Sequence, residues 1–313
     1  QISPRVGFAY QLGGQAVLHF SYGHFFQMPP MYAMYQNNSF LVDPNNFVTR
    51  MGNTLLEPEK TITYEIGLWQ ELNQVMALDV ALFYRDIYNL LTTKTISTYN
   101  QVKYGLYSNK DYGNVRGLEL KLDLAMGQLK GMVNYTLQYT RGNADSPGQT
   151  FDRAGNNQDP VNRLIPMGWD QRHTLNGSLI YGTEKYGGSM TAYYNSGSPY
   201  TFAPQSESVL SRINLYPNND YRPEKYSVDC SFYYRFKLPG GYNANLDVNI
   251  YNLFDRLNEE WVNDQTGRAY TAVIKETDIA GHRSDFNDYE DRIKNPSMYS
   301  SPRMVKIGIG VNF

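Results

Sequence analysis

Asp170, His173 and Ser178 are the residues of this sequence whose types suit a hydrolytic triad. The nucleophile, its base and the acid that orients the base must lie within about 3 Å of one another. The alternating residues 170–182 predict a strand, in which residues three apart point to opposite faces. Asp170 and His173 would then diverge, and no sharp glycine-flanked turn surrounds Ser178. We therefore expect no enzymatic activity.

Two further sets of residues have the chemistry of metal ligands. His19 and His24 lie five residues apart in one alternating segment, so a strand would place them on opposite faces. Five carboxylates crowd the last long loop and offer the oxygen ligands that Ca²⁺ prefers: Asp278, Asp285, Asp288, Glu290 and Asp291. Their spacing lacks the calcium-loop pattern, which favours a solvated acidic loop. The sequence predicts neither a metal site nor a cofactor.

Aromatic residues beside amides and carboxylates are frequent in the segments that we expect to be loops. Flat rings of this kind suit sugars or amphipathic ligands, and they also suit loops that pack on one another. The candidate ligand-binding residues are Tyr32, Tyr35, Trp169, Tyr200, Tyr216, Tyr221 and Trp261. No cluster of Arg or Lys along the sequence indicates a strongly anionic cargo.

Composition narrows the class of protein. The 313 residues include 28 tyrosines and carry a net charge of −2, which gives no basic field for nucleic acid. No window approaches 18 uninterrupted apolar residues, which excludes helical membrane spans. The single Cys230 excludes a disulfide framework. Excess tyrosine fits the aromatic belts of a membrane barrel, although a large soluble β-protein would also be rich in tyrosine. We expect any export signal to lie outside this chain.

Alternation of apolar and polar residues predicts about eleven strands. They span residues 4–12, 15–26, 60–72, 75–91, 112–126, 128–141, 170–182, 187–197, 224–237, 242–254 and 303–313. Tight turns follow every second strand, and long loops follow the others, at 27–59, 92–111, 142–169, 198–223 and 255–302. Periodicity alone fits a soluble sandwich as well. The strand lengths and the loops at one end favour an antiparallel transmembrane β-barrel with its apolar face outward.

The number of strands implies a larger barrel. An open sheet edge in hydrocarbon would leave backbone groups unpaired, and single-chain bacterial barrels have even strand numbers. We therefore expect residues 1–313 to be the carboxyl-terminal part of a single barrel domain. The missing strands would lie upstream or, as the alternative, in another chain.

Several strings, in order, resemble the TonB-dependent outer-membrane receptors. They are ISPRVG at 2–7, SYGHFFQMPP at 21–30, LEPEK at 56–60, YEIG at 64–67, YGNVRGLE at 112–119, DQRH at 170–173, SGSPYT at 196–201, NLFD at 252–255 and the terminal Phe313. The branch with a carboxypeptidase-regulatory-like amino-terminal domain is the most similar. The resemblance implies a barrel of about 22 strands that is filled by a plug domain. The plug, the TonB-contacting segment and the amino-terminal strands are not among these residues, and we expect them upstream.

The resemblance also implies roles for residues and partners. Glu65, Arg116 and Glu119 would point into the lumen and contact the plug, and Phe313 would be the assembly signal read by the barrel assembly machinery. The TonB–ExbB–ExbD complex would supply energy, and a surface lipoprotein is a further candidate partner beside the outer-membrane lipid. The protein would lie in the outer membrane of a Gram-negative bacterium, with its carboxyl terminus periplasmic and its long loops extracellular.

Import of a scarce nutrient is the function that the resemblance favours. The loops would capture a glycan, siderophore, cobalamin or peptide, and the plug would release it when the energised partner pulls. The alternatives are a structural or scaffold barrel in an envelope complex, a passive porin, and a soluble secreted β-protein.

Overall fold

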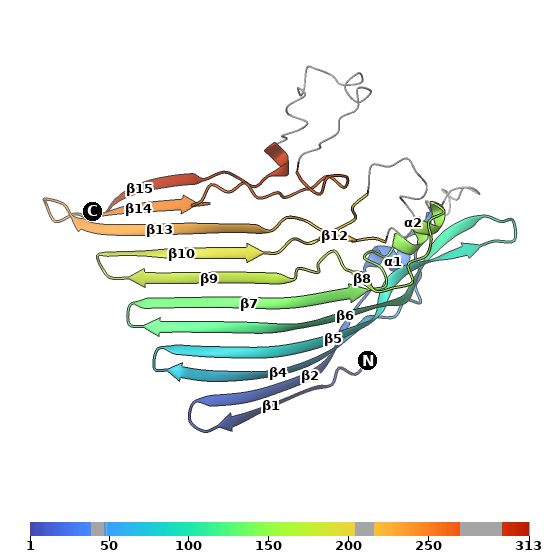
Figure 1. The fold of residues 1–313 in the computed structure, drawn as a ribbon, viewed down its shortest axis with the longest axis horizontal. Coiled ribbons are helices and arrows are strands. Elements are labelled where there is room, and N and C mark those ends of the chain that lie inside the picture. Colours follow the sequence, from blue (N-terminus) through green and yellow to red (C-terminus); the bar gives the residue numbers. More distant parts are fainter. Residues whose placement is uncertain (39–46, 48, 204–215, 270–295, 313) are drawn as a thin grey trace, which may run out of the picture.

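The computed structural model describes residues 1–38, 47, 49–203, 216–269 and 296–312. Eleven long strands of these residues form one antiparallel sheet (Figure 1). In order across the sheet they are β1 Arg5–Leu12, β2 Ala16–Gln27, β4 Glu59–Asn73, β5 Met76–Ser97, β6 Lys103–Met126, β7 Leu129–Gly142, β9 His173–Gly182, β10 Tyr186–Asn195, β13 Lys225–Lys237, β14 Asn243–Tyr251 and β15 Met304–Asn312. The predicted number of strands is confirmed.

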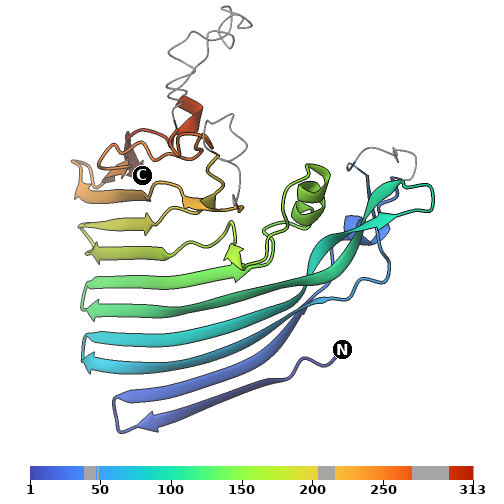
Figure 2. The same cartoon turned by 45° about the vertical axis from the view of Figure 1, so that its right-hand side comes forward.

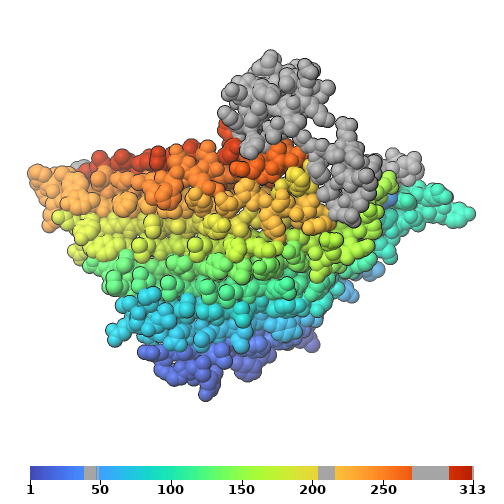
Figure 3. All heavy atoms as spheres, in the orientation of Figure 1, coloured from blue at the N-terminus to red at the C-terminus, as the bar shows by residue number. Residues whose placement is uncertain are grey.

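Each long strand pairs with the next one along the chain, so the sheet is a simple meander. The sheet is curved, and the tight turns gather at one end of it while the long connections gather at the other (Figure 2). The colours in Figure 3 follow this order as successive bands from blue to red. Strands β1 and β15 lie at the two edges, and each has one neighbour within the described residues. This is the form of a barrel wall cut open along two strands.

The strand register places apolar side chains on one face across the whole sheet. Residues paired on neighbouring strands share a face, and one row of pairs runs through Phe8, Phe20, Ile66, Leu82, Leu118 and Leu137. A second row, at the carboxyl-terminal end, runs through Phe232, Val248 and Ile307. Six of these nine side chains are exposed, with Leu82 55% and Ile307 69% accessible, and Leu118, Leu137 and Val248 are half-buried. Such a large exposed apolar surface is typical of a face that meets lipid.

The opposite face is polar. One row on it runs through Asp79, Lys121, Asn134 and Asn176. Glu65 and Glu119 lie on this same face, and their contact with a plug stays a prediction. A polar interior is what a barrel with a filled or aqueous lumen requires.

Arg116 does not share the face of the two glutamates, so its predicted position in the lumen is wrong. It pairs with Tyr84 on β5 and with Tyr139 on β7, both on the apolar face. Arg116 and Glu119 are three residues apart on one regular strand, and a period of two puts them on opposite sides. Arg116 instead continues a row of tyrosines from Tyr22 and Tyr64, whose ring centroids are 5.1 Å apart. Tyrosine and arginine together are typical of a membrane interface.

Glycine and Asn shape the tight turns. β6 and β7 are joined by two residues, and the first of them, Gly127, has a φ of +57° that L side chains rarely adopt. Gly240 and Gly241 have φ values of +92° and +85° between β13 and β14. At the β4–β5 turn the Asn73 side chain accepts a hydrogen bond from the Val75 N–H, at 3.0 Å. These local choices fix which residues face each other across each hairpin.

Most of residues 92–111 are strand, with a turn at 98–102, which corrects the prediction of a loop over the whole range. β5 continues to Ser97 and β6 begins at Lys103, and they pair with each other throughout. An irregularity near Asn89, whose φ is +60°, separates this ribbon from the membrane-spanning part. Residues 92–95 of β5 and 108–111 of β6 are runs of consecutive polar residues, so the ribbon lacks the apolar period that marks the other strands.

The other long connections also contain short elements. These are α1 Met31–Tyr35, β3 Arg50–Met51, α2 Gln149–Gly155, β8 Ile165–Pro166, β11 Pro199–Tyr200, β12 Asp220–Tyr221 and η3 Pro296–Met298. α1 packs on the β5–β6 ribbon through a buried cluster of Ala33, Leu56, Leu91 and Tyr107. Phe151 of α2 is fully buried. No helix among the described residues is long and apolar enough to cross a membrane. The packed core therefore lies at the loop end of the sheet.

Candidate ligand site at the loop end

The seven aromatic candidates do not form one site. Tyr32 and Tyr35 lie on α1 and are 52% and 63% exposed, and the Tyr32 ring lies edge-on to Tyr107 at 5.8 Å between centroids. Trp169 and Trp261 are exposed, and the guanidinium of Arg222 lies 6.0 Å from the Trp261 ring. Tyr200, Tyr216 and Tyr221 belong to one connection, between β10 and β13, which includes the β11–β12 pair.

Tyr200 is buried in the β11–β12 pair. Its hydroxyl donates a hydrogen bond to Oδ2 of Asp220, on the strand opposite, at 3.2 Å. Burial, together with the neighbouring Asp220 carboxylate, raises the pKa of Tyr200 to about 12. The contact fixes the connection between β10 and β13. A role for Tyr200 as a ligand contact stays a prediction.

Asp170 lies where β9 would continue beside β7 and is fully buried. The last backbone hydrogen bond between β7 and the β9 side runs from the Gln138 N–H to the Arg172 carbonyl, at 2.9 Å. Two residues further along β7, the Thr140 N–H donates to Oδ1 of Asp170 at 2.6 Å, where a backbone carbonyl would otherwise accept it. The side chain thus satisfies a backbone donor that the missing strand would leave unpaired.

The second carboxylate oxygen of Asp170 joins two connections. Oδ2 accepts the Tyr221 hydroxyl at 2.8 Å and lies 3.5 Å from Nε of Arg172 and 4.0 Å from Nη1 of Arg141. Burial raises the pKa of Tyr221, and its bond to the Asp170 carboxylate raises it further, although the two arginines oppose the shift. We call Asp170, Tyr221, Arg141 and Arg172 the Asp170 network.

A pocket of about 320 Å³ opens beside the Asp170 network. Arg141, Arg163 and Arg172 line it, with Tyr216 and Tyr221. Nη2 of Arg172 donates to the Tyr221 hydroxyl at 2.8 Å, and the Arg163 guanidinium lies 4.9 Å from the Tyr216 ring centroid. The three arginines form no cluster along the sequence, because they lie in separate segments that only the folded connections bring together. We call this pocket the arginine pocket.

A larger cavity of about 1040 Å³ adjoins the arginine pocket and shares Arg163, Tyr216 and Asn218 with it. Most of its other lining residues are polar ones from the α2 segment, including Gln149, Asn156 and Asp159. Nδ2 of Asn218 donates to the Pro166 carbonyl at 2.8 Å and so joins the two connections that form both spaces. Amide and carboxylate groups around such a cavity suit a ligand with many hydrogen-bonding groups.

The hydrolytic residues do not converge. His173 pairs with Leu137 on the apolar face, and its Nδ1 lies 2.9 Å from the Tyr135 hydroxyl. Ser178 pairs with Met132 and Thr191 on the polar face. A nucleophile and a base on opposite sides of one sheet cannot exchange a proton.

The two histidines of β2 also diverge. Nε2 of His19 lies 3.3 Å from Oδ1 of Asp79 on the polar face, whereas His24 contacts the Tyr22 hydroxyl on the apolar one. Within the described part of the chain no group of three potential metal ligands comes together. The acidic loop residues from Asp278 to Asp291 and the predicted assembly signal Phe313 lie outside the described residues.

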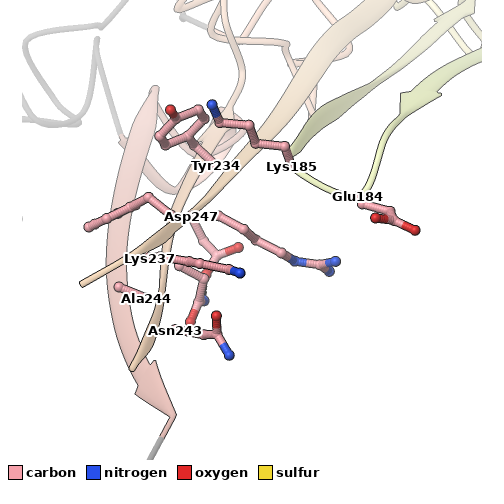
Figure 4. A pocket seen from close by; sticks show the side chains of 10 residues that line it. Glu184, Lys185, Tyr234, Lys237, Asn243, Ala244 and Asp247 are labelled. Carbon is pink, nitrogen blue, oxygen red and sulfur yellow. The ribbon is translucent and has the colours of Figure 1, made fainter. Parts of the chain in front are cut away.

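A separate pocket of about 860 Å³ lies at the opposite end, beside the tight turns. Glu184 and Lys185 border it from the β9–β10 turn, and Lys237, Asn243 and Asp247 project into it from β13 and β14 (Figure 4). None of the predicted ligand-binding residues lines it. It lies far along the strands from the aromatic connections, so we treat it as a separate feature.

Comparison with known proteins gives a family and a fold. The family model described as TonB dependent receptor-like, beta-barrel matches residues 1–253. A search of curated proteins gives no match. Among solved structures, the chain is similar to the ferric-catecholate import receptor Fiu from E. coli K12, with a TM-score of 0.54 and 19% identity over 84% of this chain and 32% of that one.

Two further structures are similar to the chain. The FpvAI–pyocin S2 complex matches with a TM-score of 0.56 and 16% identity, over 98% of this chain and 33% of that one. The pyoverdine outer membrane receptor FpvA from Pseudomonas aeruginosa PAO1, bound to pyoverdine, matches with a TM-score of 0.52 and 19% identity, over 82% and 32%. The chain therefore spans about a third of the length of these structures, and at such identities the likeness shows the fold alone.

Proposed function

The chain belongs to the TonB-dependent receptor-like β-barrel family, and we propose that it is the carboxyl-terminal part of an outer-membrane receptor that imports a scarce nutrient. The observation that carries this proposal is that one face of the sheet is apolar and the opposite face is polar. One apolar row passes through successive strands on the exposed side, and charged and amide side chains fill the other side. Such a wall separates lipid from a polar lumen. The cargo is a glycan, siderophore, cobalamin or peptide.

We propose that residues 1–313 form part of a single barrel domain that further strands complete. Strands β1 and β15 each have one neighbour among the described residues, and an unpaired edge in hydrocarbon is costly. The polar face would surround a plug domain, and Glu65 and Glu119 would contact it. Both lie on that face, on neighbouring rows, and Glu119 is exposed.

The proposed orientation follows from the two ends of the sheet. Short turns face the periplasm and long connections face outward in outer-membrane barrels. The tight turns and the carboxyl terminus would therefore be periplasmic, near the TonB–ExbB–ExbD complex, and the arginine pocket would face the cell exterior. Phe313 would be read by the barrel assembly machinery, and a surface lipoprotein would cover the outer connections. Neither nucleic acid nor a covalent reaction has a place in this scheme.

Energy-dependent uptake is the decisive test. We expect cells that carry the receptor to accumulate one labelled cargo from a panel of ferric siderophores, cobalamin, oligosaccharides and peptides. Deleting the TonB partner should abolish that uptake. Uptake that persists without TonB, together with steady ion conductance of the purified barrel in a planar bilayer, would instead favour a passive porin. A protein that shows neither activity, but that retains a stable envelope complex, would favour a scaffold.

A further inference from the structure

The arginine pocket brings together three permanent positive charges that the sequence keeps apart. Arg141 is the second-to-last residue of β7, Arg163 precedes β8, and Arg172 precedes β9. Guanidinium groups stay protonated at all physiological pH values, so their mutual repulsion is constant. One buried carboxylate, that of Asp170, lies near Arg141 and Arg172. The net charge at the pocket is therefore positive.

The contacts of the three arginines leave donors for a ligand. Each guanidinium has five N–H donors in a planar fork. Arg172 uses Nη2 on the Tyr221 hydroxyl and holds Nε near Asp170, while Arg141 lies 4.0 Å from the same carboxylate. Arg163 lies against the Tyr216 ring, lines the pocket and is exposed. A planar fork of this kind matches the geometry of carboxylate and phosphate oxygens.

The pocket is also held in shape. The Arg172 guanidinium lies 4.4 Å from the Tyr139 ring centroid and 5.2 Å from that of Tyr221. Asp170 fixes Tyr221 from the other side, and Asn218 ties the wall to the Pro166 carbonyl. Donors that are fixed before binding lose little rotamer freedom when the ligand arrives.

We propose that the arginine pocket is an anion subsite that binds a phosphate or carboxylate group, with Arg163 as the contact that closes over the ligand. The binding is independent of transport, whereas the statement that this anion belongs to the imported cargo rests on the proposed function. A volume of about 320 Å³ admits one small polyanion or the charged end of a longer ligand that continues into the adjoining polar cavity. The same chemistry is found in a soluble nutrient and in a phosphorylated lipid headgroup.

Binding of inorganic phosphate and of citrate to the full-length receptor tests the site. The receptor is purified in detergent and titrated with each anion at constant ionic strength. Added salt would otherwise weaken the interactions of exposed charges by screening alone. We expect saturable binding of at least one anion and an affinity about tenfold weaker in Arg163→Gln. Arg163→Lys should keep part of the affinity, since lysine keeps the charge and loses the fork.

Arg235→Gln is the matched control. Arg235 lies at the opposite end of the sheet, and its guanidinium is 4.9 Å from the Tyr233 ring, the same distance as Arg163 from Tyr216. It should bind both anions as the unchanged receptor does. The proposal is overturned if neither anion binds saturably, if Arg163→Gln binds like the unchanged receptor, or if Arg235→Gln weakens binding equally.

A lipid measurement separates the two sources of the anion. If a headgroup fills the pocket, the unchanged receptor co-purifies with more phosphorylated glycolipid than Arg163→Gln does, and removing the lipid exposes phosphate binding. If the ligand is soluble, the lipid content of the two proteins is equal. Anion binding without TonB-dependent uptake would refute the import function and keep the subsite, and uptake without anion binding would do the reverse.

Discussion

Asp170 shows how one side chain substitutes for a strand. β9 begins only at His173, so without Asp170 the Thr140 N–H of β7 would face no acceptor. The Asp170 carboxylate accepts that donor and at the same time holds Tyr221 of the next connection. A carboxylate has four lone-pair sites, so one residue can serve a backbone group and three side chains. Together with the bond from Asn218 to the Pro166 carbonyl, this buried carboxylate holds the connection that contains the β11–β12 pair.

Replacing Asp170 should loosen this junction first. In Asp170→Ala, the Thr140 amide loses its acceptor, and Arg141 and Arg172 lose their counter-charge. A hydrogen bond to a charged group contributes about 1.5–3 kcal/mol, so we expect hydrogen exchange of the Thr140 amide to quicken about ten- to a hundredfold. Tyr221→Phe removes the two bonds of the Tyr221 hydroxyl, to Asp170 and from Arg172, but keeps the acceptor of the Thr140 amide, so it should leave that amide protected. Equal exchange in Asp170→Ala and the unchanged chain would contradict this account.

Tyr200 gives a second prediction at this scale, through pH. Its folded pKa, about 12, lies above the ordinary value of 10, so the folded state keeps the proton longer than the unfolded chain does. The stabilisation is complete below pH 10 and is lost as the pH rises towards 12. The difference in alkaline absorbance at 295 nm between the unchanged protein and Tyr200→Phe should titrate near 12. Asp220→Asn should lower this midpoint; an unchanged midpoint would show that Asp220 has no part in the shift.

Local sequence patterns do not predict which residues contact one another at the loop end. Leu118, Leu120 and Leu122 reveal their strand because period two is a local property. Arg141, Arg163 and Arg172 reveal nothing in isolation, since their meeting depends on how two connections fold back and on the Asp170 network. Arg116 is the instructive error. A resemblance suggested its role, but its distance of three residues from Glu119 already excluded a shared face.

At the scale of elements, the β5–β6 ribbon and α1 stabilise each other. A two-stranded ribbon alone is marginal in water, and a helix of one turn does not form by itself. Leu91 and Tyr107 of the ribbon bury the Ala33 side of α1. The side-chain amide of Asn53 donates to the Tyr107 carbonyl at 2.9 Å. The polar composition of the ribbon gives no apolar alternation, so the sequence does not predict these strands. Its order arises from this tertiary packing.

Leu91→Ala should therefore release α1. The side chain is 7% exposed, and truncating a buried leucine costs about 2–5 kcal/mol. We expect faster hydrogen exchange in α1 and at the Gly52 and Asn53 amides, with the rest of the sheet unchanged. Leu55→Ala is the matched control, because Leu55 is 85% exposed and should have no effect. If both substitutions leave exchange unchanged, the cluster does not hold the ribbon.

At the scale of the whole molecule, the two faces of the sheet require different solvents. The same strands present Leu120 to one side and Glu119 to the other, and every neighbouring strand repeats this division. In a soluble sheet the apolar rows would meet a second layer, yet here many of their side chains are exposed and no second layer covers them among the described residues. A lipid environment removes the cost of that exposure. The fold is therefore complete only in a membrane.

A pair of substitutions one residue apart tests this division. Leu120→Arg puts a charge on the apolar face among Val80 and Tyr135, where it should cost about 2–4 kcal/mol near the middle of a bilayer. Glu119→Arg puts the same side chain on the polar face, where it should be tolerated. We expect much less folded Leu120→Arg protein in the outer membrane, measured by heat-modifiable gel mobility, and near-normal amounts of Glu119→Arg. The opposite ranking would mean that the polar face meets lipid, and the proposed barrel would be inside out.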